Sequence, residues 1–167
     1  IKVMDLPYGK LRDKGIPIDN LCNYSSKDEG IIFLIDSNAI KNQTLLFTTK
    51  LGMSKLVDTS EFDVSKKMVL ATKLSEGDEL ISIDKVNISK SVYTKFTVDG
   101  EKVEEEIIES DLLIVYKTAE GMLLKFPLSD IPEKKKNAVG VRCIKLAAND
   151  YIDEIYIFAQ DLDITIE

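Results

Sequence analysis

Lysine, arginine and carboxylate side chains are the groups in this sequence that could bind a ligand or take part in a reaction, because none of the 167 residues is histidine. Without imidazole, Ser-His-Asp and Cys-His catalysis and histidine-based zinc sites are excluded. Carboxylates could still hold a hard cation, but there is no D-x-D-x-D-G loop, no P-loop and no G-x-G-x-x-G. We therefore expect no metal, no cofactor and no catalytic site in this chain.

Positive charge recurs in two corresponding parts of the chain. Residues 44–73 contain five lysines against three acidic residues, and residues 117–145 contain seven basic residues against three acidic ones. If these parts lie on one rim of a repeating fold, they form a basic surface. Such a surface binds phosphate groups without reading bases, and its affinity falls steeply with salt. The other interpretation is that these lysines only keep the surface solvated.

The basic segments belong to a pattern that occurs twice in the same order. Residues 44–83 read as an apolar strand, a Lys/Gly turn, a second strand, a short Lys-rich loop, an apolar run and a closing strand. Residues 113–157 repeat this order, and the later copy carries extra turn residues. Residues 3–35 match the second half of the pattern and lack its opening strand. Chance similarity between strand-turn-strand patterns is the alternative explanation.

This repetition predicts an all-β, propeller-like array of about three repeat units, in which neighbouring units cover each other's apolar faces. The units fall at about residues 1–41, 42–83 and 111–160 of a single domain, with an insert at 84–110. Unbroken or alternating apolar runs predict the buried strands. These strands are residues 31–35, 45–47, 80–83, 113–116 and 155–158.

The insert has a hairpin signal of its own. Residues 91–98 alternate in polarity before Asp99-Gly100, and residues 101–108 follow as the return strand. A helix over residues 104–109 is the competing interpretation. Near the chain end, residues 162–166 alternate with period two. We expect them to form a strand that pairs with the first unit, in the same chain or in a neighbouring copy.

The overall charge argues against the basic surface. The formal net charge is −7 and the pI is ≈ 4.8, which alone disfavours nucleic acid as a partner. The acidic excess lies in the insert, in the turn at residues 75–84 and in the tail after Leu146. Two classes of function therefore stay open: a DNA-contacting domain with a basic rim, and an acidic propeller-like module that binds protein and not DNA.

Composition fits a globular protein, with 44% hydrophobic and 31% charged residues. No apolar run approaches the roughly 20 residues of a membrane span, so we expect no membrane partner. Cys22 and Cys143 have no C-x-x-C spacing, which predicts reduced, buried, structural cysteines in a cytoplasmic protein. The chain begins with isoleucine and has no leader-like segment, so we expect a domain or fragment of a longer protein.

Several stretches resemble a known family. LLFTTKLGMSKL, SEF and KKMVLATKLSEGDELISI in the second unit are similar to the repeats of the C-terminal domain of DNA gyrase A and its topoisomerase IV counterpart. LIVYKTAEGMLLKFPLSDIP and NAVGVRCIKL in the third unit are similar to the same repeats. VMDLPYGKLRDKGIPIDNL resembles such a repeat entered at its middle. The resemblance covers roughly residues 3–83 and 111–159 and leaves the insert unexplained.

The resemblance implies a β-pinwheel, an array of four-stranded blades in which neighbouring blades exchange a strand. It implies that the outer basic surface contacts or wraps duplex DNA, and that the partners are DNA and the rest of the A-type subunit of a bacterial type IIA topoisomerase. Cleavage would be performed by a tyrosine outside this domain. By position, the implied DNA contacts are Lys10, Arg12, Lys14, Lys66, Lys67, Lys134, Lys135, Lys136 and Arg142.

The sequence departs from the family in two respects. The Arg- and Gly-rich box of gyrase is missing, because the comparable loops are residues 10–15, 63–68 and 133–140. Weak, salt-sensitive binding is therefore expected in place of strong chiral wrapping, as in a topoisomerase IV-like or divergent relative. The family's domain also has more blades than this chain has material for.

Overall fold

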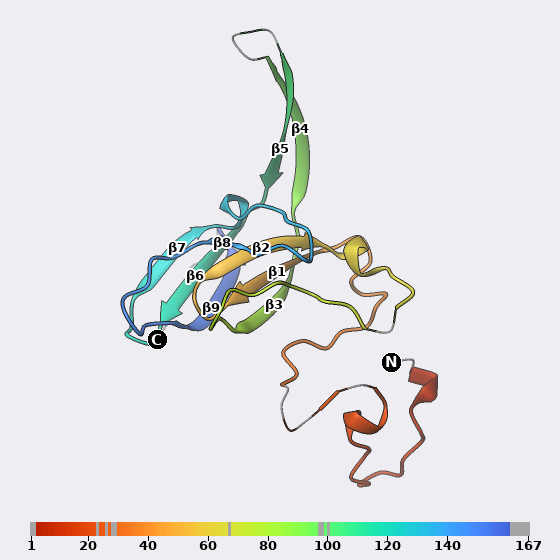
Figure 1. The fold of residues 1–167 in the computed structure, drawn as a ribbon. Helices are drawn as coiled ribbons and strands as arrows, with labels where there is room; N and C mark the ends of the chain where they lie inside the picture. The colour runs from red at the N-terminus through yellow and green to blue at the C-terminus, as the bar shows by residue number, and fades with distance from the viewer. Residues whose placement is uncertain are drawn as a thin grey trace. The chain divides into compact units, whose positions relative to one another are not determined.

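A computed structural model describes residues 3–22, 24–25, 27, 30–66, 68–96, 99 and 101–160. Every regular element within these residues is a β-strand or a short 3-10 helix (Figure 1). No helix in the described part is long and apolar enough to cross a membrane. The chain divides into two compact units, Ile1–Ile32 and Phe33–Glu167. The predicted all-β fold class is confirmed.

The first unit has no strand among its described residues. Its regular elements are the 3-10 helices η1 (Val3–Asp5) and η2 (Ile18–Asn20). The buried strand predicted at residues 31–35 is wrong, since this run has no regular structure and Ile31 and Leu34 are exposed. A strand needs a neighbour that satisfies its N–H and C=O groups, and no described strand pairs with this run.

The second repeat forms a four-stranded antiparallel sheet in the order β3-β1-β2-β8 (Figure 1). Three of its strands are local: β1 (Thr44–Thr49), β2 (Met53–Asp58) and β3 (Leu80–Val86). The fourth, β8 (Val141–Arg142), lies within the third repeat. One repeat therefore completes the sheet of the repeat before it, as expected of a pinwheel.

The third repeat forms a three-stranded antiparallel sheet in the order β7-β6-β9. Its strands are β6 (Leu112–Thr118), β7 (Leu123–Pro127) and β9 (Ile152–Ala159). The central strand of each sheet shifts register near its end, at Thr48/Thr49 in β1 and at Lys117/Thr118 in β6. The two sheets are therefore copies of one arrangement.

Matching hydrogen bonds show how the two hairpins correspond. The Thr49 hydroxyl accepts the backbone N–H of Met53 at 3.0 Å, and the Thr118 hydroxyl accepts that of Met122 at 3.2 Å. The two turns therefore have equal length, and the extra turn residues predicted for the third repeat are wrong. The sequence pattern aligned β6 with β1 one residue out of register, because both strands are apolar at successive positions.

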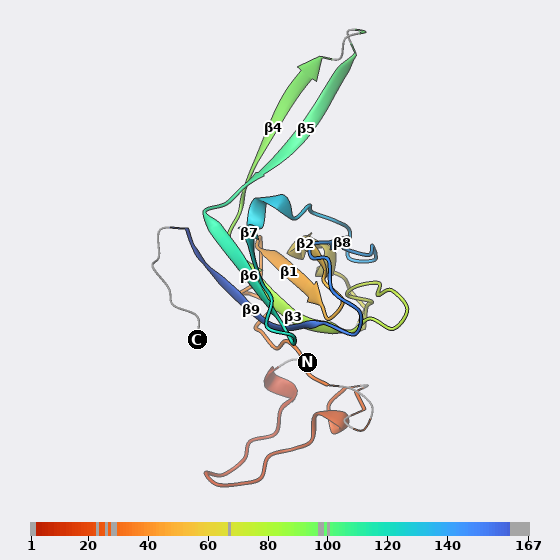
Figure 2. The same ribbon diagram turned by 90° about the vertical axis from the view of Figure 1, so that its left-hand side faces the viewer.

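The insert forms the predicted hairpin and not a helix. Strand β4 (Ser89–Phe96) pairs with β5 (Lys102–Glu109) in a separate two-stranded sheet, which extends away from the two larger sheets in Figures 1 and 2. Its base is attached to the sheets by the ammonium of Lys90, which lies 2.5 Å from Glu133 and 3.7 Å from Asp58.

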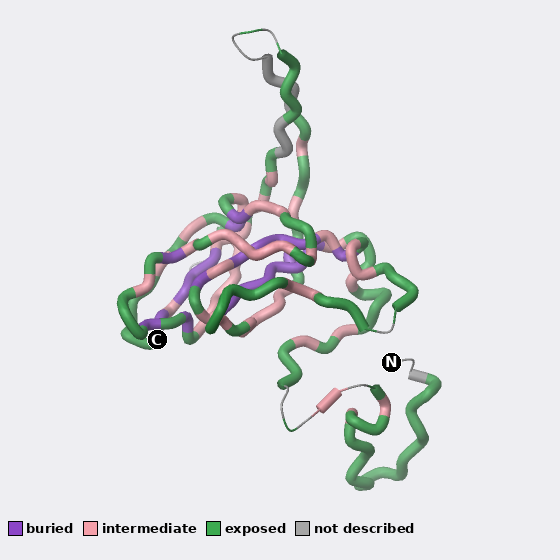
Figure 3. The backbone as a smooth tube through the Cα atoms, in the orientation of Figure 1, coloured by how far each residue is buried: buried purple, intermediate pink, exposed green. Residues whose placement is uncertain are grey.

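The main core lies between the two larger sheets, where Figure 3 shows the buried residues gathered. Leu46 and Leu56 of the second repeat and Ile114 and Tyr116 of the third are fully buried there. The Tyr116 hydroxyl is 2.7 Å from the hydroxyl of Ser54, and burial raises the pKa of Tyr116 to about 12. A smaller cluster on the opposite face of the second repeat's sheet contains Leu45, Phe47 and Val57.

The remaining strand predictions have mixed outcomes. Residues 45–47 form a buried strand, as predicted, and residues 113–116 form a strand with three buried positions. Residues 80–83 and 155–158 are strands but only half-buried. The strand predicted at residues 162–166 lies outside the described residues.

Candidate nucleic-acid interface

Residues 128–146, named here segment III, bind the outer edge of β2. The backbone of Leu56 donates to the Pro132 carbonyl at 3.1 Å and accepts from the Lys134 N–H at 2.8 Å. Further along, the Cys143 N–H donates to the Gly52 carbonyl at 2.9 Å, and β8 pairs with β2. Segment III carries three of the predicted DNA-contacting lysines, so this edge contact positions them.

A buried lysine fixes the turn of segment III. The ammonium of Lys55 donates to the backbone carbonyls of Lys135 at 3.2 Å, Lys136 at 2.6 Å and Ala138 at 2.8 Å. It also lies 5.4 Å from the centre of the Phe47 ring. Burial lowers the pKa of Lys55 to about 8, against the opposing effect of the Glu61 carboxylate. Lys55 therefore binds the backbone of the basic turn. It does not bind the lysine side chains of that turn, which point elsewhere.

The three lysines of this turn have different surroundings. Lys134 and Lys135 are exposed, whereas Lys136 is half-buried. The Lys135 ammonium lies 3.3 Å from the Glu61 carboxylate. The Lys136 ammonium donates to the Glu61 carbonyl and lies 5.9 Å from the centre of the Phe62 ring. Lys135 and Lys136 thus both contact Glu61 of the second repeat, while Lys134 projects from a fixed backbone.

Glu61 connects the two repeats electrostatically. Burial acts to raise the pKa of Glu61, but hydrogen bonds from the Lys135 side chain and the Lys136 backbone, together with both ammonium charges, hold that pKa below its usual value. The carboxylate is therefore ionised at neutral pH and offsets part of the positive charge of the turn.

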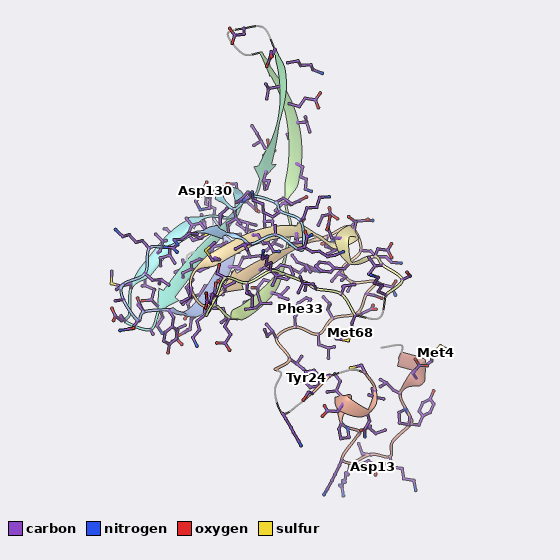
Figure 4. The ribbon with its side chains drawn as sticks, viewed as in Figure 1. Met4, Asp13, Tyr24, Phe33, Met68 and Asp130 are labelled. Carbon is purple, nitrogen blue, oxygen red and sulfur yellow. The ribbon has the colours of Figure 1, made fainter. Side chains whose placement is uncertain are left out.

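Two of the predicted contact loops meet in the structure. Lys66 of the second repeat and Lys136 of the third line one shallow hollow. The rest of its lining is mostly apolar and includes Met68, labelled in Figure 4. The structure therefore places one lysine from each of two corresponding loops of successive repeats at the same hollow. Lys67 lies outside the described residues.

The other predicted contacts belong to other segments of the chain. Lys10, Arg12 and Lys14 are exposed in the first unit, on a turn closed by the Asp13 N–H and the Lys10 carbonyl at 3.0 Å. Arg12 takes a positive φ of 78° there. Arg142 is exposed on β8 and lines a different hollow, together with Lys50 and Tyr151.

Sequence reasoning missed the roles of Lys50 and Lys55. The ammonium of Lys50 lies 5.0 Å from the centre of the Tyr151 ring, and both residues line the same hollow as Arg142. No local signal marks Lys55 as buried, because its carbonyl partners lie about 80 positions further along the chain. Its neighbours Leu56 and Val57 show that the strand is apolar and do not reveal what covers it.

The cysteines and carboxylates give no indication of another site. No group of three or more metal-ligating side chains occurs among the described residues. Cys143 is half-buried, and burial raises the pKa of its thiol. Cys22 is exposed, so the prediction that both cysteines are buried is wrong for Cys22.

An antiparallel sheet completed by a strand from the next repeat defines this protein as a propeller-type repeat domain. The family model described as DNA gyrase C-terminal domain, beta-propeller, matches residues 43–87 and 118–157. The chain belongs to this family, which confirms the resemblance found in the sequence.

Curated relatives include the A-type subunits of two enzymes. That of DNA gyrase from Campylobacter jejuni is 25% identical over 162 residues, which covers 87% of this chain and 18% of that protein. The DNA gyrase A subunit from Chlamydia pneumoniae is 30% identical over 148 residues, which covers 87% of this chain and 15% of that protein. The A subunit of DNA topoisomerase 4 from Staphylococcus epidermidis is 26% identical over 140 residues, which covers 82% of this chain and 14% of that protein. The chain thus spans less than a fifth of these relatives.

Two solved structures share the fold. The E. coli ParC C-terminal domain has a TM-score of 0.62 at 16% identity, covering 89% of this chain and 54% of that one. A DNA gyrase A C-terminal domain has a TM-score of 0.59 at 19% identity, covering 87% and 40%. Both likenesses support the propeller-type arrangement of the sheets.

Proposed function

We propose that this chain is the duplex-DNA-binding C-terminal domain of a type IIA topoisomerase, belongs to the A-type subunit of that enzyme and has no catalytic role of its own. The observation that carries the proposal is the meeting of Lys66 with segment III at one hollow. There, the exposed Lys66 and the half-buried Lys136 of successive repeats share a surface despite the acidic total charge. Family membership supports the same conclusion.

The surface suits phosphate groups better than base edges. Lys134 and Lys135 are exposed point charges on a backbone that Lys55 holds in place, and Lys135 is ion-paired to Glu61. Such groups neutralise phosphates without carrying sequence information. Glu61 reduces the local charge, which favours weak, salt-sensitive contact over tight wrapping. Lys10, Arg12 and Lys14 of the first unit, Lys67, and Arg142 on β8 are proposed as additional contacts.

The remaining partners follow from the family. The rest of the topoisomerase would supply the cleavage chemistry, and the role on DNA would be a bacterial, cytoplasmic one. Edge strands would allow contact with a neighbouring copy. An acidic module that binds protein in place of DNA is the alternative that the test below distinguishes.

Removing two exposed lysines should weaken DNA binding in a salt-dependent manner. In the double variant Lys134→Ala/Lys135→Ala, up to two phosphate contacts are lost. The slope of log Kd against log salt concentration should then flatten by about 0.9 for each lost contact. The measurement is fluorescence anisotropy of a labelled duplex at several salt concentrations, with two unrelated sequences that should respond alike.

The matched control is Lys41→Ala/Lys102→Ala, which removes the same charge from exposed positions outside the predicted contact loops. It should leave the salt slope close to that of the wild type. An equal loss in both double variants would mean that only total charge matters. No binding of wild-type protein to DNA at low salt would favour the protein-binding alternative.

A further inference from the structure

The insert hairpin of β4 and β5 lies between the two parts of the chain that the family model matches, residues 43–87 and 118–157. It meets the rest of the protein at the start of segment III. Strand β5 contacts the 3-10 helix η4 (Leu128–Asp130), with which segment III begins. Asp130 lies near the base of the hairpin in Figure 4. The insert is therefore joined to the segment that carries the basic turn.

Apolar packing fixes the base of the hairpin beside segment III. Ile88, which directly precedes β4, and Ile108 of β5 are half-buried and pack against the main core. The same core contains Leu128 and Ile131 of segment III, which are both fully buried. Ile108 pairs with Lys90 across the hairpin, and residues that pair directly lie on the same face of a sheet. Lys90 therefore lies on the face of the hairpin that packs on the protein.

Lys90 joins the end of β2 to the residue before the basic turn. Its ammonium lies 2.5 Å from the carboxylate of Glu133 and 3.7 Å from that of Asp58. Glu133 forms a parallel β-bridge with Leu56, and the next residue, Lys134, donates its N–H to the Leu56 carbonyl at 2.8 Å. One ammonium of the insert thus holds both strands of this contact.

Asp58 extends the contact to the other side of the turn. Its carboxylate accepts the Ser60 N–H at 2.8 Å and caps the 3-10 helix η3 (Thr59–Phe62). Hydrogen bonds from Ser60, together with the Lys90 ammonium, hold the pKa of Asp58 below its usual value, against the effect of burial. The helix η3 carries Glu61, the carboxylate that contacts the basic turn. Lys90 therefore contacts supports on both sides of the turn.

Lys90 also affects the charge that a phosphate group would meet. Three carboxylates lie around the basic turn, those of Asp58, Glu61 and Glu133, and they equal in number the lysines of the turn. Lys90 is paired with two of them. Without its ammonium, these two carboxylates would repel a phosphate group nearby, because like charges are unfavourable at an interface.

We propose that the insert hairpin is part of the DNA-binding site and that Lys90 is its positioning residue. Lys90 holds Glu133 and Asp58, so the basic turn keeps its place on β2 and both carboxylates are neutralised beside it. The phosphate contacts themselves come from the lysines of the turn. This inference rests on the proposed DNA-binding function and gives a role to a segment that the family model does not cover.

Duplex binding by three single variants tests the role of Lys90. Lys90→Met removes the ammonium and keeps the apolar stem, and it should weaken affinity by at least about fivefold at low salt. Lys90→Arg keeps the charge and can bind both carboxylates, so its affinity should stay within about twofold of the wild type. Lys102→Met is the matched control, because Lys102 lies on the same hairpin and pairs with Glu104 at 3.0 Å. It should change affinity by less than about twofold.

A double-mutant cycle shows whether Lys90 acts through Glu133. In the Glu133→Gln background, one of the two carboxylates is already neutral, so Lys90→Met should weaken DNA binding less than it does in the wild type. Equal losses in the two backgrounds would overturn the positioning role, since Lys90 would then act without Glu133. Equal losses for Lys90→Met and Lys102→Met would also overturn it, because only the total charge of the insert would matter.

Hydrogen exchange of the free protein tests the positioning without DNA. The Lys134 amide is bonded to the Leu56 carbonyl, so Lys90→Met should speed its exchange by at least about fivefold as this contact opens locally. Lys102→Met should leave it unchanged, and the amide of Leu46 in β1 should be unaffected in both variants.

The two measurements separate this inference from the function on which it rests. Absence of DNA binding by the wild type would overturn the proposed function, and this inference with it. Wild-type DNA binding together with unchanged Lys134 exchange in Lys90→Met would overturn this inference alone.

Discussion

Replacing Gly140 with alanine is expected to lower the free energy of unfolding by about 2–3 kcal/mol, and the melting temperature by roughly 4–12 °C. A Cβ atom at this position would lie 2.6 Å from the carbonyl oxygen of Ser54, 2.8 Å from its carbonyl carbon and 2.9 Å from its nitrogen. These are backbone atoms of β2, so they cannot rotate away. Segment III would have to lift from the strand, which weakens the contact between the two repeats.

Gly30→Ala is the matched control, since no atom lies within 4 Å of the added Cβ and its φ is not positive. Its effect should be within about 0.5 kcal/mol. Thermal unfolding followed by circular dichroism measures both variants, because the chain has no tryptophan. Equal melting temperatures for Gly140→Ala and wild type would mean that segment III does not lie against Ser54 in solution.

Replacing Lys55 with methionine should cost about 3 kcal/mol or more. Hydrogen bonds from a charged donor contribute roughly 1.5–3 kcal/mol each, and Lys55 makes three, to carbonyls of segment III. Removing the buried ammonium also removes its desolvation penalty, which is several kcal/mol and lowers the pKa of Lys55 to about 8. Since three carbonyls would lose their donor and methionine replaces only the apolar stem, we expect the loss to exceed the gain.

Lys125→Met provides the comparison, because Lys125 is an exposed lysine on β7, the corresponding strand of the third repeat. It should change stability by no more than about 0.5 kcal/mol. Urea unfolding of both variants gives the difference directly. If Lys55→Met were as stable as Lys125→Met, the carbonyl contacts of Lys55 would contribute nothing net to the fold.

Strands and turns that depend on neighbouring residues could be predicted from the sequence. The alternation of residues 91–98 before Asp99-Gly100 predicted the hairpin of β4 and β5, and the apolar runs of β1 and β6 become central strands. Recurrence of the pattern also identified the repeat architecture and the family. These features rest on periodicity and turn chemistry, which act over a few residues.

Strand pairing between distant segments could not be predicted in the same way. Residues 31–35 are as apolar as β1 but form no strand, because a strand is stable only beside a partner. Conversely, the two residues of β8 are a strand because β2 lies next to them. Apolar character indicates that a segment can be buried. Only the tertiary structure shows which other segment lies beside it.

The same distinction between local pattern and tertiary packing applies to the candidate site. The amino-acid sequence by itself determined that lysines gather in corresponding loops of the repeat, and it predicted that these lysines contact phosphate groups. Only the tertiary structure decided which of them face solvent. Lys55 is buried under three carbonyls, whereas Lys134 is exposed beside them. The physical reason is that the exposure of a side chain depends on which distant backbone packs over it, and that packing arises between repeats.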